Sequence, residues 1–388
     1  MIEQSIRLQQ LEDGVFQELA LEKRRIVASG RDVIDLSVGS PDLPPSPHVM
    51  EALAQGVTDP NAYGYAITGL AEFNEAVAQF YKRYHVNLDP GTEVLQLMGS
   101  QDGLSHLALS LINPGETVLL PDPGYPIYEA SVRLAGGIPY PLPINEDTLH
   151  PNFSLIPDDV LQSARLMILN YPSNPTAGVA TRSMFEEVVR VAQTYDIFVI
   201  HDFAYSEMVY DGLEAVSLLS IPGAKDIAVE FNSLSKTFNM AGCRVGYLVG
   251  NKAVIGHLRK LKSHIDYGIF LPIQHAAITA LTTDHDFAGQ RQIYTARRDA
   301  LCDALTSYGW EVRKPAATMF VWAKTPNNRP SHAFAMELLR EAGVAVTPGA
   351  AFGPRGEGHV RMALVTDAAN LRAAAERIGQ HLAAKVLG

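Results

Sequence analysis

Lys236 lies in a segment whose residue types and spacing suit the covalent binding of a cofactor that carries a phosphate. The segment reads Ser233-Leu-Ser-Lys-Thr-Phe-Asn-Met-Ala-Gly-Cys-Arg-Val-Gly246. A lysine forms a Schiff base with an aldehyde once burial or a neighbouring charge lowers its pKa. Ser233, Ser235 and Arg244 supply the hydroxyl and guanidinium donors that an adjacent phosphate needs.

Other polar residues follow apolar runs that we expect to be strands. Asp202 comes directly after the run Ile197–His201, and Tyr205 comes three residues later. Asn174 lies in the turn-rich segment Asn170–Gly178, where the proline that follows it keeps it out of helical geometry. Open α/β sheets bind ligands at the carboxyl ends of their parallel strands, so we expect these side chains to face one site.

Ser100 and Gln101 lie where the expected strand Val94–Met98 turns into a helix. Free N–H groups and the helix dipole bind anions at such a position. Tyr125, in Pro121-Asp-Pro-Gly-Tyr-Pro126, follows another strand end, where its ring could stack on a flat cofactor.

Arg361 lies in the short run His359–Leu364 and has apolar neighbours. A buried arginine requires an anionic partner, because an uncompensated charge is costly to bury. The carboxylate of a bound substrate would supply that anion.

The order of the elements predicts an α/β protein. Strand-like runs alternate with helix-like segments, which indicates a mainly parallel sheet that is covered on both faces. The expected strands are 94–98, 117–120, 166–170, 197–201, 227–231 and 245–249, and the expected helices are 104–111 and 182–195. After residue 285 we expect a long helix over 287–308, strands 318–323, 344–347 and 359–364, and a helix over 333–342. This pattern predicts an N-terminal arm with part of a small domain (1–45), a large domain (46–285) and a C-terminal small α/β domain (286–388).

These motifs, in this order, resemble those of the pyridoxal-phosphate-dependent aminotransferases of class I/II. The resemblance covers residues 7 to 361, and the segments Arg7–Leu11 and Asp32–Gly39 are similar to the LL-diaminopimelate aminotransferase-like branch. It implies fold type I, with a mainly parallel seven-stranded sheet in the large domain and pyridoxal 5'-phosphate as the cofactor. It also implies transfer of an amino group from an L-amino acid to a 2-oxo acid, with 2-oxoglutarate as the expected acceptor.

The resemblance also implies a role for each motif residue. Lys236 forms the Schiff base and moves protons, Asp202 pairs with the ring nitrogen of the cofactor, and Tyr205 bonds its phenolic oxygen. The substrate carboxylate is bound by Gly39, Asn174 and Arg361. The expected cofactor-binding residues are Ser100, Gln101, Tyr125, Asn174, Asp202, Tyr205, Ser233, Ser235, Lys236 and Arg244, together with Tyr65 of a neighbouring subunit. We therefore expect a homodimer with shared active sites, and Tyr63 is the alternative to Tyr65.

Other functions fit parts of the sequence. A pyridoxal-phosphate-dependent carbon–sulfur β-lyase would use the same cofactor residues and release pyruvate without an oxo-acid acceptor. A sensor domain of a transcription regulator would need a basic helix-turn-helix domain, which we do not expect in this acidic chain. The donor amino acid stays open between aspartate, alanine, aromatic amino acids and LL-diaminopimelate. Arg24, Arg25 and Arg31 are equal candidates for binding a distal carboxylate of the substrate.

Composition sets the limits of these interpretations. The chain has 388 residues and a formal net charge of −11, which argues against binding to nucleic acids or to anionic membranes. Its two cysteines, Cys243 and Cys302, allow no disulfide framework, and its histidines show no metal-ligand spacing, so we expect no metal. His201 could instead support Asp202. We find no signal peptide and no apolar run of about 18 residues, and therefore expect a cytoplasmic protein.

Overall fold

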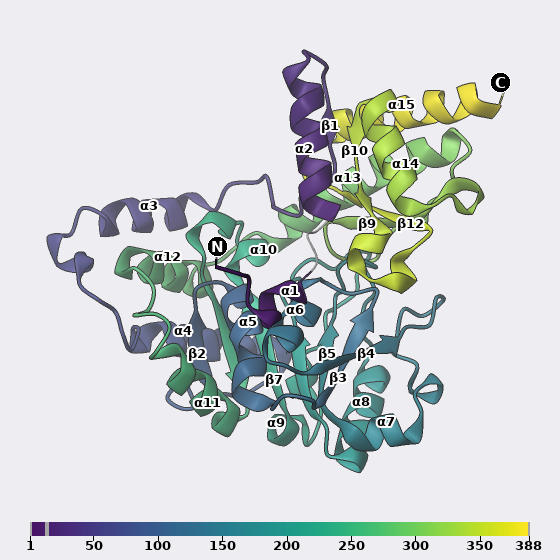
Figure 1. Cartoon of the computed structure of the whole chain (residues 1–388). Coiled ribbons are helices and arrows are strands. Elements are labelled where there is room, and N and C mark those ends of the chain that lie inside the picture. The colour runs from purple at the N-terminus through teal and green to yellow at the C-terminus, as the bar shows by residue number, and fades with distance from the viewer. Residues whose placement is uncertain (1, 12–14, 387–388) are drawn as a thin grey trace.

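A seven-stranded sheet forms the centre of the larger part of the molecule (Figure 1). The computed structural model describes residues 2–11 and 15–386. The strand order is β2-β8-β7-β6-β5-β3-β4; β8 runs antiparallel to both of its neighbours, and the other six strands run parallel. The strands are β2 (Val94–Leu97), β3 (Thr117–Asp122), β4 (Ile138–Pro143), β5 (Ala164–Asn170), β6 (Phe198–Asp202), β7 (Ala228–Ser233) and β8 (Gly246–Gly250). The predicted α/β class and mainly parallel sheet are confirmed.

Helices cover both faces of this sheet because successive residues of a strand point to opposite sides. The covering helices are α4 (Ala71–Tyr81), α5 (Ser100–Leu111), α6 (Ile127–Leu134), α8 (Arg182–Tyr195), α11 (Lys252–Lys262) and α12 (Leu271–Thr282). In β5, Leu166 and Ile168 pack in the core with α5, α6 and α11, whereas Met167 and Leu169 pack with α4, α8 and α12. A strand that is buried on both faces is apolar throughout, which explains why continuous apolar runs predicted these strands.

The edge strand β4 is absent from the prediction because its sequence is rich in proline. It reads Ile138-Pro-Tyr-Pro-Leu-Pro143, and it pairs with β3 alone. Residues two apart in a strand direct their backbone nitrogens to the same side. Pro139, Pro141 and Pro143 therefore remove hydrogen-bond donors from a single side, which an edge strand tolerates and a central strand does not.

The smaller part of the molecule is built mainly from the last quarter of the chain (Figure 1). Its elements include α13 (Phe287–Ser307), β9 (Phe320–Lys324), α14 (Ser331–Glu337), β10 (Val344–Ala345), β11 (Thr347–Pro348), β12 (His359–Ala363) and α15 (Ala368–Val386). Strands β11, β12 and β9 form an antiparallel sheet. The predicted strand over 344–347 is divided between two sheets, and the predicted helix over 333–342 ends in a π-helical turn, Leu338–Ala342.

The N-terminal residues join this smaller part. Strand β1 (Ile34–Asp35) pairs in parallel with β10, and α2 (Val15–Ala28) packs beside the same elements (Figure 1). Arg297 on α13 binds both carboxylate oxygens of Asp42 at 2.7 Å, which fixes the loop that follows β1. On these contacts we propose the division of the chain at residues 45/46 and 285/286.

The remaining helices are short. They include α1 (Ile6–Gln9), α3 (Pro47–Gly56), α7 (Asp158–Ser163), α9 (Ala224–Ile227) and α10 (Leu234–Thr237). Across residues 2–11 and 15–386, none of the helices combines the length and the apolar character that crossing a membrane requires.

Candidate active site

A cavity of about 650 Å³ opens at the carboxyl ends of the parallel strands. Asn170 and Asp202 end β5 and β6, and Ser233 ends β7, so the topology delivers their side chains to one place. The predicted site residues that line the cavity are Gly39, Ser100, Gln101, Tyr125, Asn174, Asp202, Tyr205, Ser233, Ser235, Lys236, Arg244 and Arg361. Tyr65 is not among the lining residues.

Lys236 projects into the cavity from the short helix α10. Its ammonium donates a hydrogen bond to the carbonyl of Gly39. Burial, followed by the charges of Arg361 and Arg244, lowers the pKa of Lys236 to about 8. An amine with this pKa is partly uncharged near neutral pH, which is the state that attacks an aldehyde or accepts a proton.

Asp202 is buried and receives its hydrogen bonds from two sources. The hydroxyl of Tyr128 donates to Oδ2 at 2.7 Å, and the backbone N–H of Ala204 donates to Oδ1 at 3.2 Å. Burial raises the pKa of Asp202, while the Tyr128 hydroxyl is the largest influence in the opposite direction. Tyr128 lies on α6, and the sequence analysis missed it because its contact depends on how α6 packs against the sheet.

His201 does not hydrogen-bond the Asp202 carboxylate. Adjacent residues of a strand point to opposite faces, and His201 instead contacts Glu230 at 2.8 Å and the carbonyl of Tyr171 at 3.0 Å. Both His201 and Glu230 are fully buried. The influence of His201 on Asp202 is a minor Coulombic one, which acts to lower the pKa of that carboxyl and ranks after the hydrogen bonds from Tyr128 and Ala204.

The donors for an anion lie together at one end of the cavity. Ser100 and Gln101 open α5, whose first N–H groups have no acceptor within the helix. The hydroxyls of Ser233 and Ser235 are buried nearby in the lining. Gly99 precedes α5 with a φ of +82°, and a Cβ there would lie 2.5 Å from a guanidinium nitrogen of Arg244. The glycine thus permits the arginine to approach the helix N-terminus.

Arg361 is a buried guanidinium without a carboxylate partner among the described residues. Its Nη1 donates to Oδ1 of Asn174 at 2.9 Å, and its Nη2 donates to the carbonyl of Ser37 at 3.0 Å. The guanidinium carbon lies 4.2 Å from the centre of the Phe320 ring and 4.7 Å from that of Phe352. Its Nε is buried and has no hydrogen-bond partner among the described residues, and burial lowers the pKa of Arg361 to about 10. This unfilled donor fits an anionic ligand.

The two predicted aromatic residues both face the cavity. Tyr125 donates from its hydroxyl to Oε1 of Gln101 at 3.2 Å. Tyr205 is buried, with its ring edge-on to Phe320 at a centroid distance of 5.8 Å. Burial raises the pKa of both hydroxyls, so both side chains are neutral donors at physiological pH.

Tyr65 and Tyr63 lie outside the cavity on an exposed surface. Tyr65 is 81% exposed and its ring contacts that of Tyr267 at 5.1 Å. Tyr63 donates from its hydroxyl to the carbonyl of Val57 at 2.8 Å, within its own chain. Ile67, which is close in sequence, and Phe270, whose ring contacts that of Tyr63 at 5.3 Å, are also exposed. Tyr65 could therefore contribute only to the active site of a second chain.

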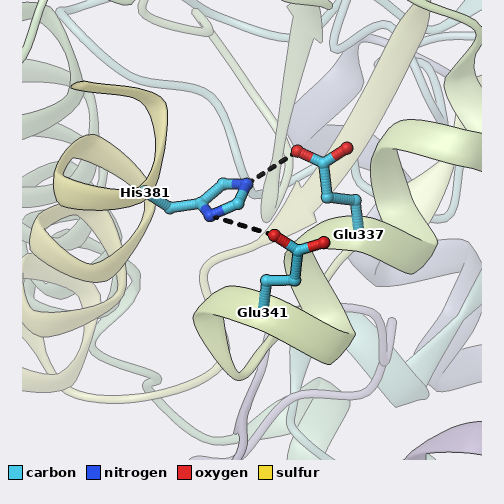
Figure 2. A group of neighbouring side chains, drawn as sticks. All are labelled: Glu337, Glu341 and His381. Atoms are coloured by element: carbon cyan, nitrogen blue, oxygen red, sulfur yellow. Dashed lines mark hydrogen bonds and ion pairs between the residues drawn. The ribbon is translucent and has the colours of Figure 1, made fainter. Parts of the chain in front are cut away.

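A second group of titratable residues lies outside the cavity lining, where α14 and its π-helical turn meet α15. Figure 2 shows His381 between Glu337 and Glu341, at 2.7 Å and 3.8 Å. Glu337 also binds Arg329 and Lys385, and these cations together with His381 lower its pKa to about 2 despite burial. The carboxylates are already compensated by side chains, so the group is an ion-pair network that joins two helices.

The lowered pKa of Lys236 predicts unusual reactivity. An amine is acylated in its uncharged form, so the modification rate at Lys236 in cofactor-free protein should rise with pH and level off above about pH 8. The modification rate of a lysine in an unstructured reference peptide should instead keep rising toward about pH 10. Brief acetylation over this range, followed by mass spectrometry of the peptides, measures both rates. Parallel profiles at the two lysines would contradict the assigned environment of Lys236.

The chain is similar to known proteins over nearly its whole length. Residues 31–378 match the family model "Aminotransferase class I and II". An LL-diaminopimelate aminotransferase of Syntrophobacter fumaroxidans is 44% identical over 96% of this chain and 97% of that protein. Substrate-bound BacF of Bacillus subtilis superposes with a TM-score of 0.95 at 36% identity, covering 98% of each chain. A probable N-succinyldiaminopimelate aminotransferase of Thermus thermophilus gives 0.90 at 38% identity, covering 94% of this chain and 99% of the other.

The family match covers most of the residues that line the cavity. Every one of the predicted motif segments lies within the matched region, except for the segment Arg7–Leu11. The relatives are aminotransferases, which does not favour the carbon–sulfur lyase alternative. The chain belongs to the class I and II aminotransferases, and it is a pyridoxal-phosphate-dependent aminotransferase of fold type I.

Proposed function

We propose that the chain transfers an amino group from an L-amino acid to 2-oxoglutarate and that Lys236 holds the cofactor and moves the protons. The observation that carries this proposal is the environment of Lys236, whose ammonium bonds a carbonyl and whose pKa is lowered to about 8. Bound pyridoxal phosphate supplies an electron sink that makes the Cα–H of an amino acid acidic. An uncharged Nζ in the cavity would accept that proton and later return it as a general base and acid.

The remaining lining residues fit the cofactor by their chemistry. Buried Asp202, with a hydrogen bond from Tyr128, is the anion that a protonated ring nitrogen needs. Asn174 and Tyr205 would bond the phenolic oxygen, and Tyr125 would cover the ring. The phosphate would be bound by the group of donors described above, which consists of Ser100, Gln101, Ser233, Ser235 and Arg244.

The carboxylate of the amino acid would bind at Arg361, whose buried Nε has no partner in the part of the chain that the structure describes. Asn174 holds Nη1 and so orients the guanidinium. At Gly39, a Cβ would lie 3.2 Å from Phe320 and 3.7 Å from Nη2 of Arg361. A glycine there leaves room beside the guanidinium for the carboxylate.

We propose LL-diaminopimelate as the first donor to test, because a relative that is 44% identical over almost the whole chain bears the name LL-diaminopimelate aminotransferase. Aspartate, alanine and aromatic amino acids are the competing donors. Adding each amino acid without acceptor, and recording the absorbance of the bound cofactor, ranks them by rate. Recovery of the original spectrum with 2-oxoglutarate would support transamination, and continuous release of pyruvate together with ammonia in the absence of an acceptor would contradict it.

We also propose a homodimer in which Tyr65 reaches the cofactor phosphate of the other chain. Exposed apolar residues surround Tyr65, and contiguous apolar surface of this kind is typical of interaction sites. The hydroxyl of Tyr63 is engaged with Val57 of its own chain, which leaves Tyr65 as the better candidate.

Substitutions of Lys236 and of Arg361 should affect different kinetic constants. Lys236→Ala removes the proton-transfer group and should lower kcat by roughly 100- to 10,000-fold or more. Arg361→Ala should mainly raise KM for amino acids, by an amount equivalent to about 2 to 5 kcal/mol of lost binding. Steady-state kinetics measures both. An unchanged rate for Lys236→Ala would refute the assigned role of this lysine.

Removal of one hydroxyl tests the shared site. Tyr65→Phe should weaken cofactor binding about tenfold or more, because a hydrogen bond to a charged group is lost. Tyr63→Phe is the matched control and should leave the dissociation constant of the cofactor unchanged. Equilibrium dialysis of the cofactor, with sedimentation of each variant to establish its oligomeric state, checks the prediction. Monomeric wild-type protein that binds the cofactor normally would contradict it.

Loss of the Tyr128 hydroxyl tests how Asp202 is held ionised. In Tyr128→Phe the burial of Asp202 is unchanged but its shortest hydrogen bond is gone, so the pKa of Asp202 should rise further. The pH at which the cofactor spectrum changes should shift as a result, and cofactor affinity should fall. A spectrum-against-pH titration measures the shift, and a profile identical to that of the wild type would show that Tyr128 has only a packing role.

A further inference from the structure

Helix α2 forms one wall of the active-site cavity. Phe16, Leu19, Ala20 and Lys23 line the cavity, and their spacing of three and four residues places them on one face of the helix. Three of these side chains are apolar, so Lys23 is the charged group that this wall presents to a ligand.

The arginines that the sequence offered as partners of a distal carboxylate do not line the cavity. Arg24, Arg25 and Arg31 are all exposed. Arg25 pairs instead with Glu22 on the outer side of the helix, at 3.7 Å. The helical period therefore turns Lys23 inward and its neighbour Arg24 outward, which the linear sequence does not reveal.

The helix is anchored, so the position of Lys23 is defined. Leu19 and Ile26 pack against Met336 and Leu339 in a small apolar cluster. On the outer side, Glu22 binds Arg340 at 2.6 Å. These contacts fix both the rotation and the distance of α2 relative to the cavity.

A short chain of polar contacts connects Lys23 with Arg361. The Nζ of Lys23 lies 2.6 Å from Oδ2 of Asp35. The other oxygen of Asp35 accepts from the N–H and the hydroxyl of Ser37 at 2.9 Å and 2.6 Å. The carbonyl of Ser37 in turn accepts from Nη2 of Arg361 at 3.0 Å. The two cations are thus held in one rigid arrangement on the same side of the cavity.

Within the described residues, four cations line the cavity, and three of them have a proposed role. Lys236 holds the cofactor, Arg244 the phosphate and Arg361 the α-carboxylate. We propose that Lys23 binds the second carboxylate of a dicarboxylic substrate and thereby selects for acidic substrates. This inference rests on the proposed function, because it takes Arg361 as the partner of the first carboxylate.

The second carboxylate has two possible sources. One is a short dicarboxylate such as 2-oxoglutarate, and the other is the distal end of diaminopimelate. Both present the same group to Lys23, whose ammonium has three N–H donors and uses one of them on Asp35.

The ion pair with Asp35 sets the size of the expected effect. The pKa of Asp35 is lowered by Lys23 and Ser37 against the effect of burial, so its carboxylate stays charged beside the proposed ligand. The side chain of Lys23 is also 27% exposed, and solvent weakens its interactions. We therefore expect Lys23 to contribute about tenfold in affinity, less than a fully buried charged hydrogen bond would give.

The test compares an unreactive dicarboxylate with a monocarboxylate of the same length. Calorimetric titration of the holoenzyme with glutarate and with pentanoate gives dissociation constants without turnover. Lys23→Met keeps most of the side-chain volume and should weaken glutarate binding about tenfold while leaving pentanoate binding unchanged. Lys23→Arg keeps the charge and should recover most of the glutarate affinity.

Arg24→Met is the matched control, because it makes the same kind of change one residue along, on the exposed side of α2. It should leave both dissociation constants unchanged. Equal weakening of glutarate and pentanoate by Lys23→Met would show that α2 has merely moved, and an unchanged glutarate affinity would show that Lys23 serves only Asp35. Either result overturns the proposal.

Half-reaction rates of Lys23→Met identify the source of the second carboxylate. Pentanoate binding to Arg361→Ala tests the proposed α-carboxylate site separately from the role of Lys23. If the half-reaction of Lys23→Met is slower at limiting concentrations of 2-oxoglutarate, the short dicarboxylate is the ligand. Slower reaction with limiting LL-diaminopimelate identifies the distal end of the donor. Pentanoate binding that survives Arg361→Ala would instead refute the proposed α-carboxylate site, whatever the result at Lys23.

Discussion

The buried guanidinium of Arg361 is the constraint around which the active site is arranged. It is held by Ser37 from the N-terminal segment and by Asn174 from the loop after β5, while Arg361 itself lies on β12. Two phenylalanine rings enclose it. A buried charge without polar contacts would destabilise the fold, so these contacts are needed. They also hold three segments that are distant in the sequence next to one another. Its charge also disfavours protonation of Lys236.

The cavity differs in charge from the rest of the molecule. The chain carries a formal net charge of −11. Among the described residues, however, the cavity is lined by four basic side chains, Lys23, Lys236, Arg244 and Arg361, and by one acidic side chain, Asp202. A cationic cleft in an acidic protein concentrates small anions at one point and repels them elsewhere. The net charge of the chain therefore argues against large polyanionic partners. It does not indicate the charge of the small ligands that the cavity binds.

The sequence predicted those parts of the fold and site that depend on local pattern. Strands β5, β6 and β7 are largely apolar, and Asp202 was found because it follows an apolar run, whereas Ser233 was found by its spacing from Lys236. Tyr128 was missed because its role arises from the packing of α6 on the sheet, and Lys23 because its role depends on the rotation of α2. Neither contact has a local signature. The strand β4 was missed because its prolines contradict the usual preferences of a strand.

Those prolines on β4 have a consequence beyond the fold of one chain. An exposed sheet edge is a template on which further strands can add, and proteins need ways to prevent this. On β4, three residues that lack an N–H group follow one another at every second position. The outer side of this edge therefore offers few donors to an incoming strand, and its chemistry opposes the stacking of sheets into fibres.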